Sequence, residues 1–143
     1  MKIVIGSDHA GLQLKKEIIS SIKNIEFIDV GTDSEESCDY PDYIAKVAEA
    51  VQQGKADGGI AICGTGIGAS LVANKFTSVR AALCFNEFMA EMSKRHNNAN
   101  VLALGARVIG VDLALRIVER WLETPFDGGR HQRRLDKLAS YER

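Results

Sequence analysis

The sequence has little of what marks membrane, secreted and nucleic-acid-binding proteins. No apolar run approaches the roughly 20 residues that a membrane-spanning helix needs. The first residues enter a strand-like pattern without the long apolar stretch of a secretory signal. The formal net charge of -1 lacks the basic excess of a general nucleic-acid binder. We therefore expect a cytoplasmic protein that binds neither membranes nor nucleic acid, and any anion site must be local.

Disulfide and metal-ligand patterns are also missing. The chain has three cysteines, an odd set without a CxxC pair, which suits reduced thiols better than a disulfide framework. The histidines His9, His96 and His131 lie far apart in the sequence, without an HxxxH pair or a further ligand at metal spacing. We expect neither a metal nor another cofactor.

Short β-branched runs alternate with amphipathic stretches along the chain. The runs predict strands at 2–6, 26–30, 58–63, 79–84 and 100–105, and the stretches predict helices at 11–23, 42–53, 66–75, 86–96 and 111–122, with a last polar helix after Arg130. Such alternation is typical of a parallel sheet covered by helices on both faces. We predict one Rossmann-like, three-layer α/β/α domain over residues 1–143 with a five-stranded parallel sheet. The segment 125–143, set off by a break in the helical pattern, is expected to reach a partner subunit.

Two polar, glycine-containing loops follow predicted strands. Residues 7–11 follow the first strand, and residues 63–68 follow the third. In open parallel sheets, ligands bind beyond the carboxyl ends of the strands, near the point where the strand order reverses. If both loops serve one site, the first and third strands must be adjacent, with the second strand outside them.

The run Cys63-Gly64-Thr65-Gly66-Ile67-Gly68 opens a predicted helix. Its backbone N–H groups and the positive end of the helix dipole would face a bound anion or a developing oxyanion. Gly64, Gly66 and Ala69 satisfy only the degenerate G-x-G-x-x-A form of the dinucleotide fingerprint, and they follow the third strand rather than the first. No P-loop sequence occurs. A phosphate-binding or nucleotide-binding module without catalysis is an alternative.

Cys63 itself has two interpretations. A free cysteine at the end of an apolar strand is most often a small buried hydrophobe. A thiol beside a helix N-terminus, however, has its thiolate stabilised and can act as a base or a nucleophile. Ala69 stands where a Cys-x5-Arg phosphatase loop would need arginine. A phosphocysteine carrier of the sugar phosphotransferase type stays an alternative, although its loop would be expected after the first strand.

One histidine and three arginines are further candidates. His96 closes a predicted helix, where the dipole favours a cation, and it could instead serve acid-base catalysis near neutral pH. Arg130 and Arg134 lie four apart, on one face if the segment is helical, and Arg107 follows the fifth strand. Each could be a solvated surface charge, but converging guanidinium groups form fork-like bonds to phosphate. The three together favour a phosphate site.

Several segments, in order and with few gaps from Met1 to about Arg134, match a known family. They are Gly6-Ser7-Asp8-His9-Ala10-Gly11, Asp39-Tyr40-Pro41, the run that begins at Cys63, Ala73-Asn74-Lys75-Phe76, His96-Asn97, Asn100-Val101-Leu102 and Gly128-Gly129-Arg130-His131. Together they resemble ribose-5-phosphate isomerase type B, within the group that includes galactose-6-phosphate and allose-6-phosphate isomerases.

The resemblance implies interconversion of ribose 5-phosphate and ribulose 5-phosphate through an enediolate. It also implies a homodimer whose two sites each borrow residues from both chains. Two such dimers could pair further into a tetramer. Cys63 would remove the proton from carbon 2, and the partner subunit's His96 would open the furanose ring. The other implied site residues are Gly64, Gly66, Ile67 and Gly68 around the enediolate oxygen, Thr65 for proton movement, Asp8, Tyr40 and Asn97 on the sugar, and His9, Arg107, Arg130 and Arg134 on the phosphate.

One departure within the family bears on the base. A branch of the family lacks the cysteine and places a glutamate base just beyond the glycine loop, where this chain has Ala69. Alanine accepts no proton, so the resemblance assigns this chain to the cysteine-bearing branch. An allose or galactose 6-phosphate remains an alternative substrate, because a few side chains decide whether a pocket holds five or six carbons.

Overall fold

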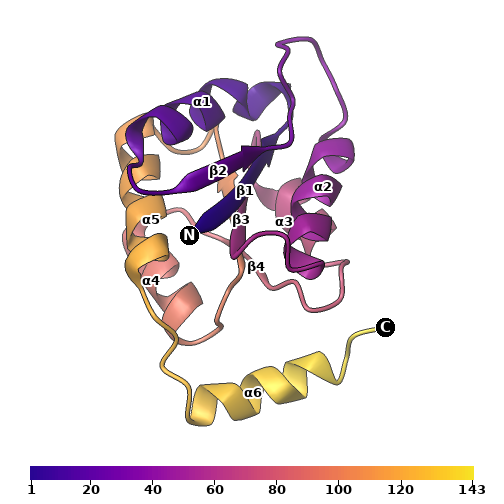
Figure 1. Cartoon of the computed structure of the whole chain (residues 1–143), viewed down its shortest axis with the longest axis vertical. Helices are drawn as coiled ribbons and strands as arrows, with labels where there is room; N and C mark the ends of the chain where they lie inside the picture. Colours follow the sequence, from indigo (N-terminus) through magenta and orange to yellow (C-terminus); the bar gives the residue numbers. More distant parts are fainter.

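Five parallel strands form one sheet in the computed structural model, which describes residues 1–143 (Figure 1). The strands are β1 (Lys2–Ser7), β2 (Glu26–Asp29), β3 (Gly58–Cys63), β4 (Ala81–Leu83) and β5 (Val101–Gly105). Their order is β2-β1-β3-β5-β4, so the predicted parallel sheet and the adjacency of the first and third strands are confirmed. The strand order reverses between β1 and β3, and the two polar loops follow the carboxyl ends of these two strands.

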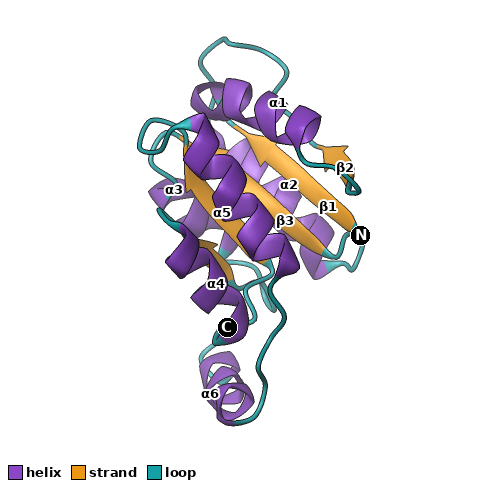
Figure 2. Cartoon of the chain, turned by 90° about the vertical axis from the view of Figure 1, so that its left-hand side faces the viewer, coloured by secondary structure: helices purple, strands orange, loops and turns teal.

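Helices cover both faces of the sheet (Figure 2). One face carries α1 (Leu12–Ser21), α4 (Glu87–Arg95) and α5 (Val111–Glu123), and the other carries α2 (Tyr40–Gln52) and α3 (Ile67–Ala73). A short 3-10 turn, η1 (His9–Gly11), precedes α1, and α6 (Arg130–Ala139) is the last helix of the chain. The predicted three-layer α/β/α arrangement is therefore confirmed.

Alternate residues of the strands supply two separate cores. In β3, Ile60 and Ile62 pack against the α1, α4 and α5 layer, whereas Ala61 and Cys63 pack against α2 and α3. Successive strand side chains point to opposite faces, and both faces are apolar because helices cover both. Each fully buried isoleucine or leucine stabilises the fold by about 1.5–3 kcal/mol. This alternation places the Cys63 side chain on the α3 side of the sheet.

Helix α6 stands apart from the three layers, beyond the ends of α4 and α5 (Figure 1). Its only buried residue is His131. The segment before it is tied to the end of α4, because the Asp127 N–H donates to the Arg95 carbonyl oxygen at 3.0 Å and Arg95 Nε lies 3.2 Å from Asp127 Oδ2. The helix is thus fixed at its first turn and exposed along the rest of its length.

Most predicted strands and helices differ from the structure by one or two residues at an end, and two of these differences have a clear local cause. Helix α2 begins at Tyr40 rather than at residue 42, because Pro41 in its first turn fits a position where no N–H is needed. Strand β4 covers only Ala81–Leu83 rather than 79–84, because it lies at the sheet edge and the Arg80 N–H donates to Asn100 Oδ1 at 2.7 Å. None of the helices has the length and apolar character of a membrane span.

Candidate active site

The carboxyl ends of β1 and β3 bring the two polar loops together. The backbone N–H of Asp8 donates to the carbonyl oxygen of Ile62 at 3.2 Å. Asp8 is 6% exposed, and its Oδ1 accepts the N–H groups of Ala10 at 3.0 Å and Gly11 at 3.1 Å, which caps η1. Both bonds use Oδ1, so Oδ2 is left for a ligand at the sheet edge.

Cys63 is the last residue of β3 and lies under the glycine loop. Its side chain is buried, and the backbone N–H of Gly66 donates to its Sγ at 3.2 Å. Gly66 adopts φ 79, which is a left-handed conformation, and α3 begins at the next residue. The hydroxyl of Thr65 accepts the Ile67 N–H at 3.2 Å and keeps its own proton to donate. The loop therefore aims a backbone donor at the sulfur and exposes the Thr65 hydroxyl to solvent.

Two side chains lie directly against glycines of this loop. The Tyr40 ring packs on Gly68, where an added Cβ would lie 2.7 Å from Tyr40 Cζ, and Arg107 lies over Gly64, where an added Cβ would lie 3.3 Å from Nη1. The Arg107 N–H also donates to the Gly64 carbonyl oxygen at 2.9 Å. A side chain at 68 would displace the tyrosine ring, whereas one at 64 would shift the guanidinium group by only a few tenths of an ångström.

The orientation of His9 follows from one hydrogen bond. The backbone N–H of Cys38 donates to His9 Nδ1 at 3.2 Å. The neutral imidazole therefore carries its proton on Nε2, as assigned from this bond. An imidazole held this way can donate its Nε2–H to an anion near the loop.

A second group of predicted residues lies at the opposite edge of the sheet. His96 and Asn97 follow the end of α4, which runs antiparallel to the strands and so ends at their amino edge. Arg130 and Arg134 lie on the first turns of α6, four residues apart on one helix face, as the spacing predicted. The structure thus groups His96, Asn97, Arg130 and Arg134 away from the glycine loop.

Cys63 lies at the carboxyl ends of the strands and His96 at their amino ends, so about one strand length separates them. A strand of 6 residues such as β3 spans about 20 Å. The residues that the structure brings around Cys63 are Asp8, His9, Tyr40, Gly64, Thr65, Gly66, Ile67, Gly68 and Arg107. One chain therefore does not assemble the complete predicted set.

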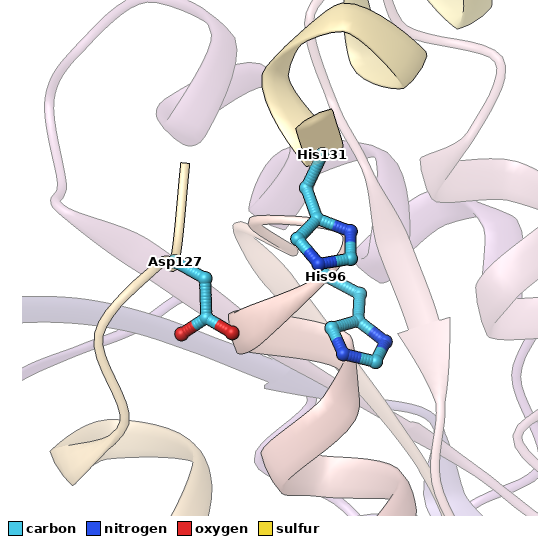
Figure 3. Close-up of side chains that lie close together, drawn as sticks. All are labelled: His96, Asp127 and His131. Atoms are coloured by element: carbon cyan, nitrogen blue, oxygen red, sulfur yellow. The ribbon is translucent and has the colours of Figure 1, made fainter. Parts of the chain in front are cut away.

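His96 stacks on a histidine that the sequence did not single out as functional. The rings of His96 and His131 are 4.3 Å apart between centroids and inclined by 12°, and the Asp127 carboxylate lies beside them (Figure 3). One ligand atom from each of the three residues lies within 4.8 Å of the others. No HxxxH spacing marks this group in the sequence, because a helix end and a glycine turn from distant segments bring its residues together.

The positive charges around this cluster favour an anion over a metal cation. Burial lowers the pKa of His131, and the neighbouring charges of His96, Arg130 and Arg134 lower it further, while Asp127 raises it. Asp127 is already paired with Arg95. The two rings are nearly parallel, so the in-plane lone pairs of their nitrogens do not converge on one point. A metal would require both rings to turn out of the stack.

A hollow of about 660 Å³ lies between α6 and the segment 74–82. Phe76, Leu135 and Leu138 are among its apolar walls, and Asn97 lies at its border. No residue of the glycine loop lines it. The hollow is therefore connected with the amino-edge group and not with Cys63.

Comparisons with known proteins agree with the resemblance. Residues 3–138 match the family described as Ribose/Galactose Isomerase. Ribose-5-phosphate isomerase B of Escherichia coli (strain K12) is 48% identical over 143 residues, which cover 99% of this chain and 96% of that protein.

Solved structures are similar over the whole fold. Ribose-5-phosphate isomerase B of Clostridium thermocellum is 56% identical with a TM-score of 0.96, covering 98% of this chain and 96% of that one. The Mycoplasma genitalium enzyme, solved with bound ribulose-5-phosphate, is 42% identical with a TM-score of 0.93, covering 98% of this chain and 95% of that one. With the sheet order, the glycine loop and the full-length match in agreement, the chain belongs to the ribose/galactose isomerase family.

Proposed function

We propose that this chain interconverts D-ribose 5-phosphate and D-ribulose 5-phosphate through an enediolate. The observation that carries the proposal is the hydrogen bond that the Gly66 N–H donates to Cys63 Sγ at 3.2 Å. Asp8 and Arg107 lie at the border of the loop that contains this bond. The Escherichia coli and Clostridium thermocellum relatives are ribose-5-phosphate isomerases B, and the Mycoplasma genitalium relative holds ribulose-5-phosphate, which supports the same substrate here.

Cys63 acts as the base in this proposal. Its thiolate takes the proton from carbon 2 of the open-chain aldose, and the electron pair moves to form the carbon 1–carbon 2 double bond of the enediolate. Backbone N–H groups of the run from Gly64 to Gly68 stabilise the negative oxygen, apart from those of Gly66 and Ile67, which donate to Cys63 and Thr65. The Thr65 hydroxyl carries a proton between the two oxygens, and the thiol returns its proton to carbon 1, which yields the ketose.

A second copy of the chain completes the site. His96 and Asn97 lie about one strand length from Cys63 in their own chain. We infer a homodimer in which the amino-edge group of one copy meets the glycine loop of the other. There the partner's His96 protonates the ring oxygen to open the furanose, and the partner's Asn97 orients the sugar.

Exposed apolar side chains support association between copies. Ile67 and Leu71, one helical turn apart on α3, are 53% and 61% exposed, and Phe88 on α4 is 69% exposed. Exposed large apolar side chains that lie together, as Ile67 and Leu71 do, commonly mark a protein interface. Ile67 adjoins the glycine loop, so an interface there would bring a partner to the mouth of the site.

The residues that bind the phosphate also come from both copies of the chain. His9 and Arg107 come from the loop edge of one copy, and the partner supplies Arg130 and Arg134. Guanidinium groups and an imidazole N–H bind phosphate oxygens through charge-assisted hydrogen bonds. Four donors around one phosphate hold carbon 2 in front of Cys63, while Asp8 Oδ2 accepts from a sugar hydroxyl.

A six-carbon sugar phosphate is the second candidate substrate. The matching family is described by both ribose and galactose, so both sugar lengths occur within it. A coupled assay that compares ribose 5-phosphate, allose 6-phosphate and galactose 6-phosphate decides between them. The highest kcat/KM is expected with ribose 5-phosphate, and a preference for a six-carbon sugar would replace the first candidate.

The base is tested by Cys63→Ala and Cys63→Ser, with Cys84→Ala as the matched control. Loss of a positioned base should lower kcat by about 10³-fold or more, while calorimetry still detects binding of ribose 5-phosphate. Cys84 is buried in the opposite core, so its variant should keep its turnover. Full turnover by Cys63→Ala would overturn the proposal, and a phosphothiol on Cys63 would select the carrier alternative.

A further inference from the structure

The stacked histidine pair contains a residue that the proposed chemistry does not use. His131 is 7% exposed, while the rest of α6 is half-buried or exposed. Its ring lies parallel to that of His96, with 4.3 Å between the centroids and 12° between the planes (Figure 3). His131 is thus the one residue of α6 that the fold buries. Its stacking partner is His96, which is proposed to open the furanose ring.

The chain before α6 is shaped to present this ring. Asp127 is held at the end of α4 by the backbone bond to the Arg95 carbonyl oxygen at 3.0 Å and by the Arg95 Nε contact at 3.2 Å. Gly128 and Gly129 follow with φ 70 and φ 56, a double left-handed turn that favours glycine. The His131 N–H then donates to the Gly128 carbonyl oxygen at 3.1 Å. The ion pair and the turn together fix His131 over His96.

The surroundings of His131 disfavour a positive charge on its ring. The groups around His131 are His96 from the end of α4, Arg130 and Arg134 from α6, and Asp127 from the connecting segment. Three of these four are cationic or can become so, and burial adds to their effect. Burial and these charges lower the pKa of His131, which favours the uncharged form of its ring in the stack.

We propose that His131 is a positioning residue for His96: its flat ring, stacked on the imidazole, is the platform that fixes the plane of the His96 ring. Asp127, beside both rings, offsets the positive charge when His96 is protonated. The inference rests on the proposed ring-opening role of His96. Residues of α4, the glycine turn and α6 together hold the His96 ring in a fixed orientation within its own chain, whether or not the partner's loop is present.

The test compares His131→Phe and His131→Ala in the full chain, with Gln132→Ala as control. Phenylalanine keeps a flat, uncharged ring, whereas alanine removes the platform. Gln132 is exposed and bonds to Asp136 on its own helix. We expect His131→Ala to lower kcat for ribose 5-phosphate by about 10- to 100-fold, as misorientation of a catalytic group does, with KM within about threefold. His131→Phe should recover most of this loss, and Gln132→Ala should match the wild type.

Two kinetic outcomes would overturn the proposal. If His131→Phe is as impaired in kcat as His131→Ala, a flat ring is not what His96 requires. If both variants raise KM with kcat unchanged, His131 is a phosphate ligand instead. Thermal unfolding of each variant identifies a loss of activity that merely follows unfolding.

A proton NMR measurement separates this proposal from the proposed function. A stacked aromatic ring shifts the ring-proton resonances of its neighbour, so His131→Ala should move the His96 resonances and His131→Phe should keep them displaced. Unchanged resonances in His131→Ala would refute the platform. If His96→Asn leaves kcat intact while the resonances respond as expected, the stack is real and the ring-opening role of His96 is wrong.

Discussion

The Gly66 N–H donates to Cys63 Sγ at 3.2 Å across a loop in which only two residues separate them. The bond depends on the left-handed φ of 79 at Gly66, which turns the peptide toward the sulfur. A hydrogen-bond donor aimed at sulfur stabilises negative charge on it. The conformation of one glycine thus links the end of β3, the start of α3 and the reactivity of the proposed base.

Gly66→Ala should damage both the fold and the site. An added Cβ would lie 2.9 Å from the Leu104 carbonyl carbon and 3.0 Å from the Gly105 nitrogen, in addition to the strain of the left-handed φ. We expect the free energy of unfolding to fall by about 2–4 kcal/mol. Because the donor to Cys63 moves as well, kcat should fall in the protein that remains folded. Urea unfolding and initial rates measure the two effects.

Gly54→Ala is the matched control for this variant. Gly54 also has a positive φ, 72, but an added Cβ would meet nothing within 4 Å. It should lose only the conformational part, about 1 kcal/mol, with kcat unchanged. Equal losses in the two variants would mean that close packing at Gly66 does not matter.

Lys15 is a buried cation that secures the loop after β2, which lies beside the end of β1. Its side chain is 1% exposed, and its Nζ lies 2.7 Å from Asp29 Oδ1 and 2.6 Å from the Thr32 carbonyl oxygen. Lys15→Met keeps the apolar stem but leaves both acceptors without this donor, so we expect a loss of about 1–3 kcal/mol in the free energy of unfolding. The Thr32 N–H donates to the Ser7 carbonyl oxygen at 2.8 Å, so a smaller loss of kcat should follow through Asp8.

The exposed neighbour Lys16 provides the comparison for Lys15. Lys16→Met removes the same charge from the same helix without breaking a buried bond, so its stability should stay within about 0.5 kcal/mol of the wild type. Chemical unfolding of both variants measures the difference. A similar loss in both would mean that net charge, and not the buried lysine, accounts for the effect.

Cys84 should make stability fall at alkaline pH. Burial raises the pKa of its thiol from 9.0 to about 11, opposed by a weaker hydrogen bond with Ser93. Between these pH values the unfolded chain has released the thiol proton while the folded chain keeps it. The free energy of unfolding therefore decreases as pH rises, by up to about 2–3 kcal/mol for this group.

Cys84→Ala isolates this contribution from the other groups that titrate in the same range. Its stability difference from the wild type should shrink between pH 8.5 and 10.5, measured by urea unfolding under reducing conditions. A constant difference over that range would show that Cys84 does not hold its proton more tightly in the folded chain.

Local patterns in the sequence were enough to predict the layers and the edge that carries Cys63. Strand residues on both faces are apolar, and the two polar loops require β1 and β3 to be adjacent. The stack of His96 on His131 was not predictable in this way. It depends on how the Asp127 ion pair and a glycine turn direct α6, and no residue spacing encodes that direction. Contacts of Tyr40 with Gly68 likewise join distant segments.

The proposed division of the site between two copies leads to a complementation test. Cys63→Ala and His96→Asn should each be inactive as pure proteins. In a dimer with one chain of each kind, one site receives an intact Cys63 from the His96→Asn chain and an intact His96 from the Cys63→Ala chain. Random pairing makes half of the dimers mixed, with one working site of two, so activity should return to about one quarter of the wild type.

The double variant Cys63→Ala/His96→Asn gives the control for this recovery. Paired with either single variant after co-refolding, it leaves no site with both intact residues, so no activity should return. Recovery confined to the mixture of single variants requires Cys63 and His96 to come from different chains. If that mixture stays inactive although mass spectrometry detects mixed dimers, the shared site is wrong, and α4 would have to bring His96 to Cys63 within one chain by a rearrangement of about one strand length.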